Sequence, residues 1–357
     1  DNGSRREVIY PDNSKETYAY YNNNLLQELK NIKADGTVFE EYSYTYDAAN
    51  NMTSKTETVN GVSKGTTSYT YDVLNRLKTV TEPNGRVTVY TFDASGNRQT
   101  ETITFEGNTT VNTYTYNEQN RLMGITTKVN NVIIKVSEYT YDANGNQLTI
   151  TKTPYTNGVA GDAEVVAVNE YDKLNQLTKT IAGDIVVENR YNGEGLRVEK
   201  TVDGNTTRYL YEHNKVVLEV DGDTGQQTAR NIYGINLLIR EVGTESYYYM
   251  YNGHADVTAL INTATGTVDA TYYYDAFGNI IESTGDVNNN ITYAGYQYDE
   301  ETGLYYLNAR MYDPKIARFL QEDTYRGNIN DPLSLNLYVY CFQNPLIYWD
   351  PTGHEGE

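Results

Sequence analysis

The sequence has little of three features that anchor or stabilise many proteins: cysteine, long apolar runs and basic charge. Cys341 is the single cysteine in 357 residues, which excludes an intrachain disulfide framework and leaves the redox compartment open. No stretch approaches the roughly 18 to 20 apolar residues that cross a bilayer as a helix, so we expect no membrane span. The first five residues also lack the apolar core of a signal peptide.

Basic residues are outnumbered, with 28 Lys and Arg against 48 Asp and Glu, and the net charge is −20. Because phosphate binding needs a basic face, we expect no nucleic-acid partner. The histidines His213, His254 and His354 lie far apart, with no His or Cys neighbour at ligand spacing. We therefore predict surface or turn histidines, no metal site and no cofactor. Cys341 has no adjacent His, which favours a buried or idle thiol over a nucleophile.

Tyrosine is the abundant residue, with 37 Tyr against only 6 Phe and 1 Trp. Hydrophobic residues amount to 38%, which would suggest a thin core without these rings. A tyrosine ring buries like a hydrophobe while its hydroxyl keeps a hydrogen-bond partner or water. The tyrosines are therefore predicted to form an ordinary sheet core, with a ligand-binding aromatic stripe as the alternative.

The tyrosines recur in a phrase that alternates with Ser and Thr and ends in Asp or Asn. It reads Tyr42-Ser-Tyr-Thr-Tyr46-Asp47 and returns at Tyr69 to Asp72, Tyr114 to Asn117 and Tyr139 to Asp142, with a variant at Phe92-Asp93, and most steps are roughly 20 to 25 residues. Alternation is typical of a half-buried strand, and the following Asn- or Gly-containing stretch predicts a tight turn. We expect an all-β strip of stacked hairpins, with Tyr46, Tyr71, Tyr116 and Tyr141 at equivalent places. Residues 313 to 322 are expected to hold a short helical turn.

The sequence becomes more specific after residue 272. It contains, in order, Tyr272-Tyr-Tyr-Asp275-Ala-Phe-Gly278-Asn279, Gly303-Leu-Tyr-Tyr-Leu-Asn-Ala-Arg310-Met-Tyr-Asp313-Pro314, Ala317-Arg-Phe-Leu-Gln-Glu-Asp323, Asn336-Leu-Tyr-Val-Tyr-Cys-Phe-Gln-Asn344-Pro345 and Asp350-Pro-Thr-Gly353. This order resembles the Rhs-repeat-associated core, and the earlier Tyr-Asp phrases resemble YD repeats. We divide the chain into a YD-repeat β-shell segment, residues 1–271, and a core or plug, residues 272–357.

The resemblance implies a β-hairpin strip that spirals into a hollow shell closed at one end by the core. The family includes Rhs toxins, wall-associated toxins of Gram-positive bacteria, insecticidal toxin-complex C components and animal teneurins. In bacteria such a shell holds a C-terminal toxin. The resemblance therefore implies a secreted or cell-surface bacterial protein, with its own C-terminal extension as cargo and further N-terminal repeats as partners. Because the chain opens in mid-pattern, we interpret it as an excised fragment that forms a partial shell.

Self-cleaving relatives use two aspartates and an arginine, and cut after the residue that follows Asp-Pro-x-Gly. Carried over by motif, the aspartates are Asp323 and Asp350, the arginine is Arg310 and the cleavage site is His354. Two close carboxylates share a proton, so one donates to the scissile amide while the other activates water. Asp331 is a rival for the first aspartate, because the segment between the pair is longer than the compact spacer of many cleaving relatives.

Two alternatives stay open. Asp323 and Asp350 could simply cap turns in the plug, and His354 stands where Leu is more frequent in self-cleaving relatives. The whole chain could instead be an extracellular adhesion or glycan-binding module without proteolysis. A row of exposed rings over a shallow groove would favour adhesion, whereas inward tyrosines and a buried Asp323–Asp350 pair would favour the shell.

Overall fold

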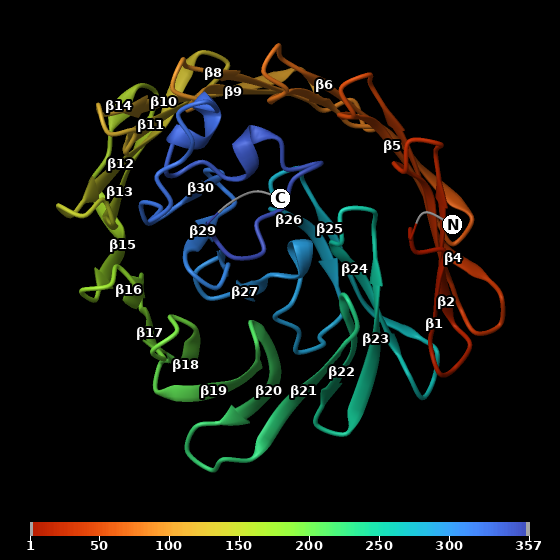
Figure 1. Ribbon diagram of the computed structural model, residues 1–357. Helices are drawn as coiled ribbons and strands as arrows, with labels where there is room; N and C mark the ends of the chain where they lie inside the picture. Colours follow the sequence, from red (N-terminus) through yellow and green to blue (C-terminus); the bar gives the residue numbers. More distant parts are fainter. Residues whose placement is uncertain (1–2, 355–357) are drawn as a thin grey trace.

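The computed structural model describes residues 3–354 and shows a chain built almost entirely of β-strands (Figure 1). These residues form one 26-stranded antiparallel sheet, a second sheet of four short strands and three 3₁₀ helices. None of the helices in this range has the length and apolar character needed for a membrane crossing. The all-β prediction is confirmed.

The strands of the large sheet, which we call the strip, are β1 (Glu7–Ile9), β2 (Lys15–Tyr20), β3 (Leu26–Ile32), β4 (Val38–Tyr46), β5 (Met52–Val59), β6 (Val62–Tyr71), β7 (Leu77–Thr81), β8 (Val87–Phe92), β9 (Arg98–Phe105), β10 (Asn108–Tyr116), β11 (Leu122–Val129), β12 (Val132–Tyr141), β13 (Gln147–Thr156), β14 (Val159–Ala160), β15 (Glu164–Tyr171), β16 (Leu177–Ala182), β17 (Ile185–Tyr191), β18 (Arg197–Val202), β19 (Asn205–Glu212), β20 (Lys215–Asp221), β21 (Gln227–Tyr233), β22 (Leu237–Val242), β23 (Glu245–Tyr251), β24 (Val257–Asn262), β25 (Val268–Tyr274) and β26 (Ile280–Thr284).

The second sheet and the helices lie in residues 291–354, the part of the predicted plug that lies beyond the strip, and the name plug is kept below for these residues alone. Their elements are η1 (Tyr293–Gly295), β27 (Gln297–Asp299), β28 (Leu304–Tyr306), β29 (Met311–Asp313), β30 (Arg318–Phe319), η2 (Pro332–Leu335) and η3 (Cys341–Gln343).

Each strand of the strip pairs with its neighbours in sequence, apart from β14, which branches from β13 while β13 continues to β15. Consecutive strands can pair because tight turns join them, as the turn between β4 and β5 shows. The Asp47 carboxylate accepts the backbone N–H groups of Ala49 at 2.8 Å and Asn51 at 2.9 Å, and Asn50 takes a φ of 67°. Asp and Asn suit such turns because a short polar side chain bonds the local backbone and tolerates positive φ. The same two carboxylate bonds recur in the turns that start at Asp72, Asp93 and Asp172.

Tyr46, Tyr71, Tyr116 and Tyr141 occupy equivalent places, as predicted, each at the end of its strand just after a β-bulge. The hydroxyls of the first three donate to the main-chain carbonyl of the first residue of the preceding strand, at 2.9, 2.6 and 2.8 Å respectively. One such bond contributes about 1 kcal/mol net. Repeated along the strip, it ties each hairpin to the one before.

The strip curves around the plug, which lies inside it (Figure 1). It is not closed by strand pairing, since β1 pairs only with β2 and β26 only with β25. Instead, side chains join its beginning to β23 and β24. Tyr10 donates to the carbonyl of Tyr249 at 2.8 Å, and Thr258 donates to Glu40 at 2.7 Å. We call this contact between the two ends the seam.

The structure differs from one local prediction. Residues 313–322 contain no helical turn, because β29 and β30 form a tight antiparallel hairpin there, with Tyr312 opposite Phe319. Pairing aromatic residues across the hairpin outweighs any local helical preference. The boundary predicted between residues 271 and 272 falls within β25, which still pairs with β24 in the strip. As a division between domains it stays a prediction.

Candidate functional site at the end of the plug

The β29–β30 hairpin brings Arg310 and Asp323 to the same end of the small sheet. Arg310 immediately precedes β29, and Asp323 follows β30 by four residues. The hairpin is extended past its last ladder pair, because Leu320 donates to the carbonyl of Met311 at 2.9 Å. Asp350 reaches this place from the last turn of the plug, beyond η3.

Arg310 joins the two aspartates. Its Nη2 lies 2.6 Å from Oδ2 of Asp323 and 3.7 Å from Oδ2 of Asp350. The side chains of all three are at most 6% exposed. Arg310 also donates from Nη1 to the carbonyl of Leu337 at 3.0 Å and from Nε to the carbonyl of Gly353. The guanidinium therefore holds both carboxylates and the backbone that leads to His354.

Burial shifts the pKa values of Arg310 and Asp350. Burial lowers the pKa of Arg310 to about 10, which leaves it protonated at neutral pH. Burial also raises the pKa of Asp350 above its ordinary value, against the lowering effect of Arg310 and of three backbone N–H groups. Desolvation disfavours the charged form of a carboxyl. Burial therefore favours the protonated form of Asp350. Arg310 lies closer to Asp323, at 2.6 Å, than to Asp350, at 3.7 Å.

The Asp-Pro-x-Gly turn is held by hydrogen bonds to Asp350 and by the backbone conformation of Gly353. Oδ1 of Asp350 accepts the N–H groups of Gly353 at 2.7 Å and His354 at 3.0 Å. Gly353 takes a φ of 76°, and a Cβ there would collide with the carbonyl of Leu307. Only glycine therefore lets the last turn approach β28 so closely. Asp350 does cap a turn, as one alternative held, but its second carboxylate oxygen still faces Arg310.

His354 completes the group. Its Nδ1 lies 3.0 Å from Oδ1 of Asp323, and its side chain is 41% exposed. A cavity of about 30 Å³ lies between Asp323, Asp350, His354 and the loop that carries Tyr325 and Leu333. That volume exceeds the roughly 10–15 Å³ that one water needs, and the walls offer polar partners. The site can therefore hold a water molecule beside both carboxylates.

Other residues singled out in the sequence lie elsewhere. Asp331 is exposed, caps η2 by accepting from Leu333, and forms no ion pair among the described residues. His213 sits in a turn with a φ of 57°. His254 is in a turn, as predicted; its side chain is 12% exposed, and its Nδ1 lies 2.8 Å from Oδ1 of Asp256. The low exposure of this histidine was not predicted, because its turn packs against Tyr293 and the Tyr348 carbonyl of the plug. Cys341 is a free, buried thiol, as predicted.

No group of His, Cys, Asp and Glu that could hold a metal ion occurs within the part of the chain that the structure describes. The site offers two carboxylates, a guanidinium, an imidazole and room for water. That set suits acid–base chemistry on the backbone that passes through it.

Comparison with protein families gives a decisive match. The teneurin YD-shell family model covers residues 4–346. The chain belongs to the teneurin YD-shell family. This confirms the resemblance to YD-repeat proteins and the strip expected from it, and it identifies the chain as a shell-like segment of an Rhs-type protein.

Individual relatives of this YD-shell chain are much longer. The tRNA nuclease WapA of Bacillus subtilis (strain 168) and the tRNA3(Ser)-specific nuclease WapA of Bacillus spizizenii are each 37% identical over 281 residues, which is 77% of this chain and 11% of theirs. The toxin protein Tse5 of Pseudomonas aeruginosa is 37% identical over 67 residues, 18% of this chain and 4% of its own length. The crystal structure of TcdB2-TccC3 matches with a TM-score of 0.44 and 16% identity, covering 96% of this chain and 22% of that one.

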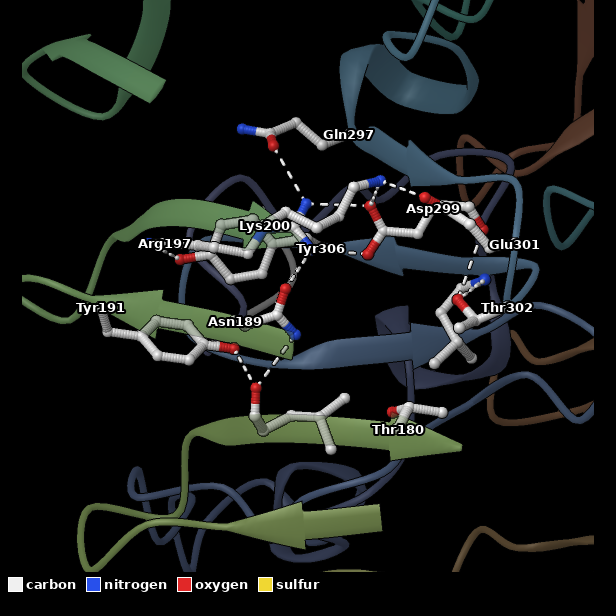
Figure 2. Close-up of polar contacts among 12 residues, drawn as sticks. Thr180, Asn189, Tyr191, Arg197, Lys200, Gln297, Asp299, Glu301, Thr302 and Tyr306 are labelled. Carbon is white, nitrogen blue, oxygen red and sulfur yellow. Dashed lines mark hydrogen bonds and ion pairs between the residues drawn. The ribbon is translucent and has the colours of Figure 1, made fainter. Parts of the chain in front are cut away.

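A second cluster of buried charges holds the YD-shell strip to its plug (Figure 2). Arg197, at the start of β18, contacts both carboxylate oxygens of Asp299 at the end of β27, at 2.5 and 3.0 Å. Lys200 adds ion pairs to Asp299 at 3.1 Å and to Glu301 at 2.7 Å. Burial alone would raise the pKa of Asp299, but Arg197 and Lys200 lower it to about 2. Asp299 is therefore ionised at any ordinary pH.

Sequence reasoning missed this cluster, although a signal was present. Arg197 follows its turn at the same offset as Arg98 follows the turn at Asp93, and both point inward from the first residue of a strand. A charged residue at an inward position of an alternating strand needs a buried partner. The partner, Asp299, lies 102 residues further along the chain, which no local pattern reveals.

Proposed function

We propose that this chain is the wall and internal plug of a shell that holds a C-terminal toxin, and that the plug cuts its own chain after His354. The observation that carries the proposal is the convergence of Arg310, Asp323 and Asp350 on the turn that ends in His354. The strip surrounds this site (Figure 1). Names of relatives support toxin cargo, since they include nucleases and a toxin.

The proposed reaction is hydrolysis of one peptide bond. Asp323, which contacts Arg310 at 2.6 Å, takes a proton from a water in the adjacent cavity, and the water oxygen attacks the carbonyl carbon of His354. Protonated Asp350 donates its proton to the nitrogen that follows, the C–N bond breaks, and His354 is left with a carboxyl group. The raised pKa of Asp350, caused by its burial, gives this carboxyl the role of the acid. Arg310 positions the chain through the Gly353 carbonyl.

The test is the mass of the intact chain after refolding from denaturant. The wild-type protein should lose the residues after His354 without added protease, whereas Asp323→Asn and Asp350→Asn should stay whole. Asp331→Asn is the matched control, because this exposed aspartate lies in the same segment outside the site. Cleavage that is equally fast in both site variants would show that the aspartates only cap turns.

Holding cargo is a separate part of the proposal. Two spaces between the strip and the plug measure about 250 and 370 Å³. Spaces of that size suit small molecules and not a folded domain. A toxin would therefore occupy a lumen that further repeats complete. The parent protein with its natural extension should protect that extension from gentle protease digestion; an extension digested as fast as when made alone would end this part of the proposal.

The adhesion alternative would need a row of exposed rings. Among residues 3–354, the aromatic side chains with large exposure are Tyr21, Tyr325 and Trp349, which are scattered in sequence. The repeated tyrosines instead lie buried or half-buried on the inner face. That arrangement supports the shell proposal over adhesion.

A further inference from the structure

A cavity of about 250 Å³, which we call the lysine cavity, lies between the inner face of the strip and the plug. Its walls come from β10–β13, β15 and β16 of the strip and from β28 and the β29–β30 hairpin of the plug (Figure 1). Among the described residues, three lysines line it, Lys135, Lys152 and Lys315, against one carboxyl group, that of Asp313. Burial raises the pKa of Asp313, which favours its neutral form. The cavity is therefore positively charged, although the chain has a net charge of −20.

The lysines of this cavity lack ionic partners and lie close to one another. No ion pair within residues 3–354 includes Lys135, Lys152 or Lys315, and Glu164, opposite Lys152 on β15, is exposed. Lys152 pairs with Ser137 across β12 and β13, and Lys135 is two residues from Ser137, so the two lysines share one face as diagonal neighbours. Burial and the charge of Lys152 lower the pKa of Lys135. An anion placed between these ammonium groups would relieve their repulsion.

Two buried polar side chains in the lysine cavity also lack partners. Ser137 is 3% exposed and Gln147 is 1% exposed, yet no hydrogen bond among residues 3–354 uses the Ser137 hydroxyl or the Gln147 side-chain amide. Buried polar groups in folded proteins nearly always have a hydrogen-bond partner. Elsewhere in the same wall this rule holds, since Thr127 donates to Asn112 at 2.8 Å. The hydroxyl and the amide are therefore donors left available for a molecule inside the cavity.

We propose that the lysine cavity binds a small molecule through a phosphate group, which Lys135, Lys152 and the Ser137 hydroxyl contact. Lysine binds phosphate as a point charge, whereas the flat carboxylate pairs best with the fork of an arginine, and no arginine of the described chain lines this cavity. Gln147 begins β13, five residues before Lys152, and offers its amide to a polar group further along the ligand. Apolar side chains line the space as well, including Ile125, Ile150 and Ile316. Free phosphate and a phosphate ester share the chemistry of the charged group, and neither depends on self-cleavage.

The test is binding of two probes, inorganic phosphate and phenyl phosphate, to the whole chain. Titration calorimetry measures affinity, and thermal unfolding at constant ionic strength, with sodium chloride as the reference salt, measures the stabilisation that a ligand of the folded state gives. We expect Lys135→Gln and Lys152→Gln each to weaken binding on the order of tenfold, the effect of one lost charge-assisted hydrogen bond. The matched control is Lys179→Gln, which removes the same charge from a surface pair with Glu188 and should keep wild-type affinity.

The variants should fold, because Lys135 and Lys152 have no ionic partner to lose and their repulsion is removed; without ligand, both should melt no lower than wild type. Tighter binding of phenyl phosphate than of inorganic phosphate would assign the cavity to a phosphate ester, and equal affinity would assign it to free phosphate. Phosphate also stabilises folded proteins in general through its exclusion from their surface. Stabilisation of wild type no greater than chloride gives, or equal in wild type and all three variants, would overturn the proposal and leave an adventitious ion only.

Discussion

The strip and the plug are built from the same tyrosine-rich sequence but are stabilised differently. In the strip, each contact is copied from unit to unit, so that one tyrosine–carbonyl bond recurs at Tyr46, Tyr71 and Tyr116. In the plug, each contact occurs once and joins distant residues. Tyr312, for example, donates to the carbonyl of Phe277, and Arg318 donates to Asn97, 221 residues away.

This difference predicts how strongly a single substitution should destabilise each region. A repeat array spreads its stability over neighbouring units, so that one lost contact weakens one interface. The contact between plug and strip instead relies on buried charges such as Arg197 of the strip and Arg318 of the plug, which are fully buried and need their partners. Removing one partner of a buried pair leaves an uncompensated charge. Single substitutions should therefore cost more at the plug than in the strip.

The largest expected effect is at Asp299. Asp299→Asn leaves the buried Arg197 without a carboxylate and Lys200 with Glu301 alone, and we expect a loss of about 3–5 kcal/mol in the free energy of unfolding by urea. The matched control is Arg208→Gln, which breaks an exposed pair with Glu199 in the neighbouring strand and should cost less than about 1 kcal/mol. Equal costs would mean that the plug is no more dependent on its charges than the strip surface.

Acid should reproduce this loss only at extreme pH. The pKa of Asp299 is about 2 in the folded protein, against about 3.9 in an unfolded chain. A lowered folded pKa gives stability that is complete above the unfolded value and is lost as pH falls through the folded value. The contribution should therefore persist down to about pH 4 and disappear toward pH 2.

A smaller effect is expected in the strip. Tyr116→Phe removes one hydroxyl bond to the Arg98 carbonyl and should cost about 1 kcal/mol. Tyr46→Phe and Tyr71→Phe should cost the same within error, because the bond repeats. Tyr116→Ala should cost about 2–4 kcal/mol, as large aromatic truncations do. If the unfolding free energies of the three Phe variants differed among themselves as much as those of Tyr116→Phe and Asp299→Asn, the contacts of the strip would not be equivalent.

The comparison also explains what the sequence could predict. Alternation and turn residues act between neighbours, so the strip, its turns and the equivalent tyrosines followed from local patterns. The inner location of the plug did not, because Arg197 and Asp299 lie far apart in the chain. The helical turn expected over residues 313–322 was wrong for a related reason: Tyr312 pairs with Phe319 across a hairpin that residue preferences alone do not indicate.

The candidate site was predictable only through motif order. No spacing rule brings Arg310, Asp323 and Asp350 together, since the β29–β30 hairpin and the last turn do so in space. The sequence left Asp323 and Asp331 as alternatives, and the structure favours the first because Asp323 is buried beside Arg310 whereas Asp331 is exposed. The contact of His354 with Asp323 had no signal in the sequence, because the histidine was regarded only as the residue beside the cut.

A pH-dependent effect is expected at the seam, where the two ends of the strip meet. Glu40 is buried there and accepts from Thr258 and from Asn31, both at 2.7 Å. Burial raises its pKa to about 7, and nearby Glu57 adds to the rise. An unfolded glutamate titrates near pH 4.3, so the folded protein holds the extra proton between these two values. A raised folded pKa gives stability that is complete below pH 4.3 and is lost as pH rises through about 7.

Glu40→Gln, which stays neutral, should therefore gain on the order of 2 kcal/mol over wild type above pH 7 and match it in acid. Glu41→Gln is the control, because this neighbouring side chain is 37% exposed and pairs with Lys30 at the surface. Urea unfolding across pH measures both, and a wild-type stability that stays level from pH 5 to about 8 would show that Glu40 keeps its charge and that the seam is as insensitive to pH as the rest of the strip.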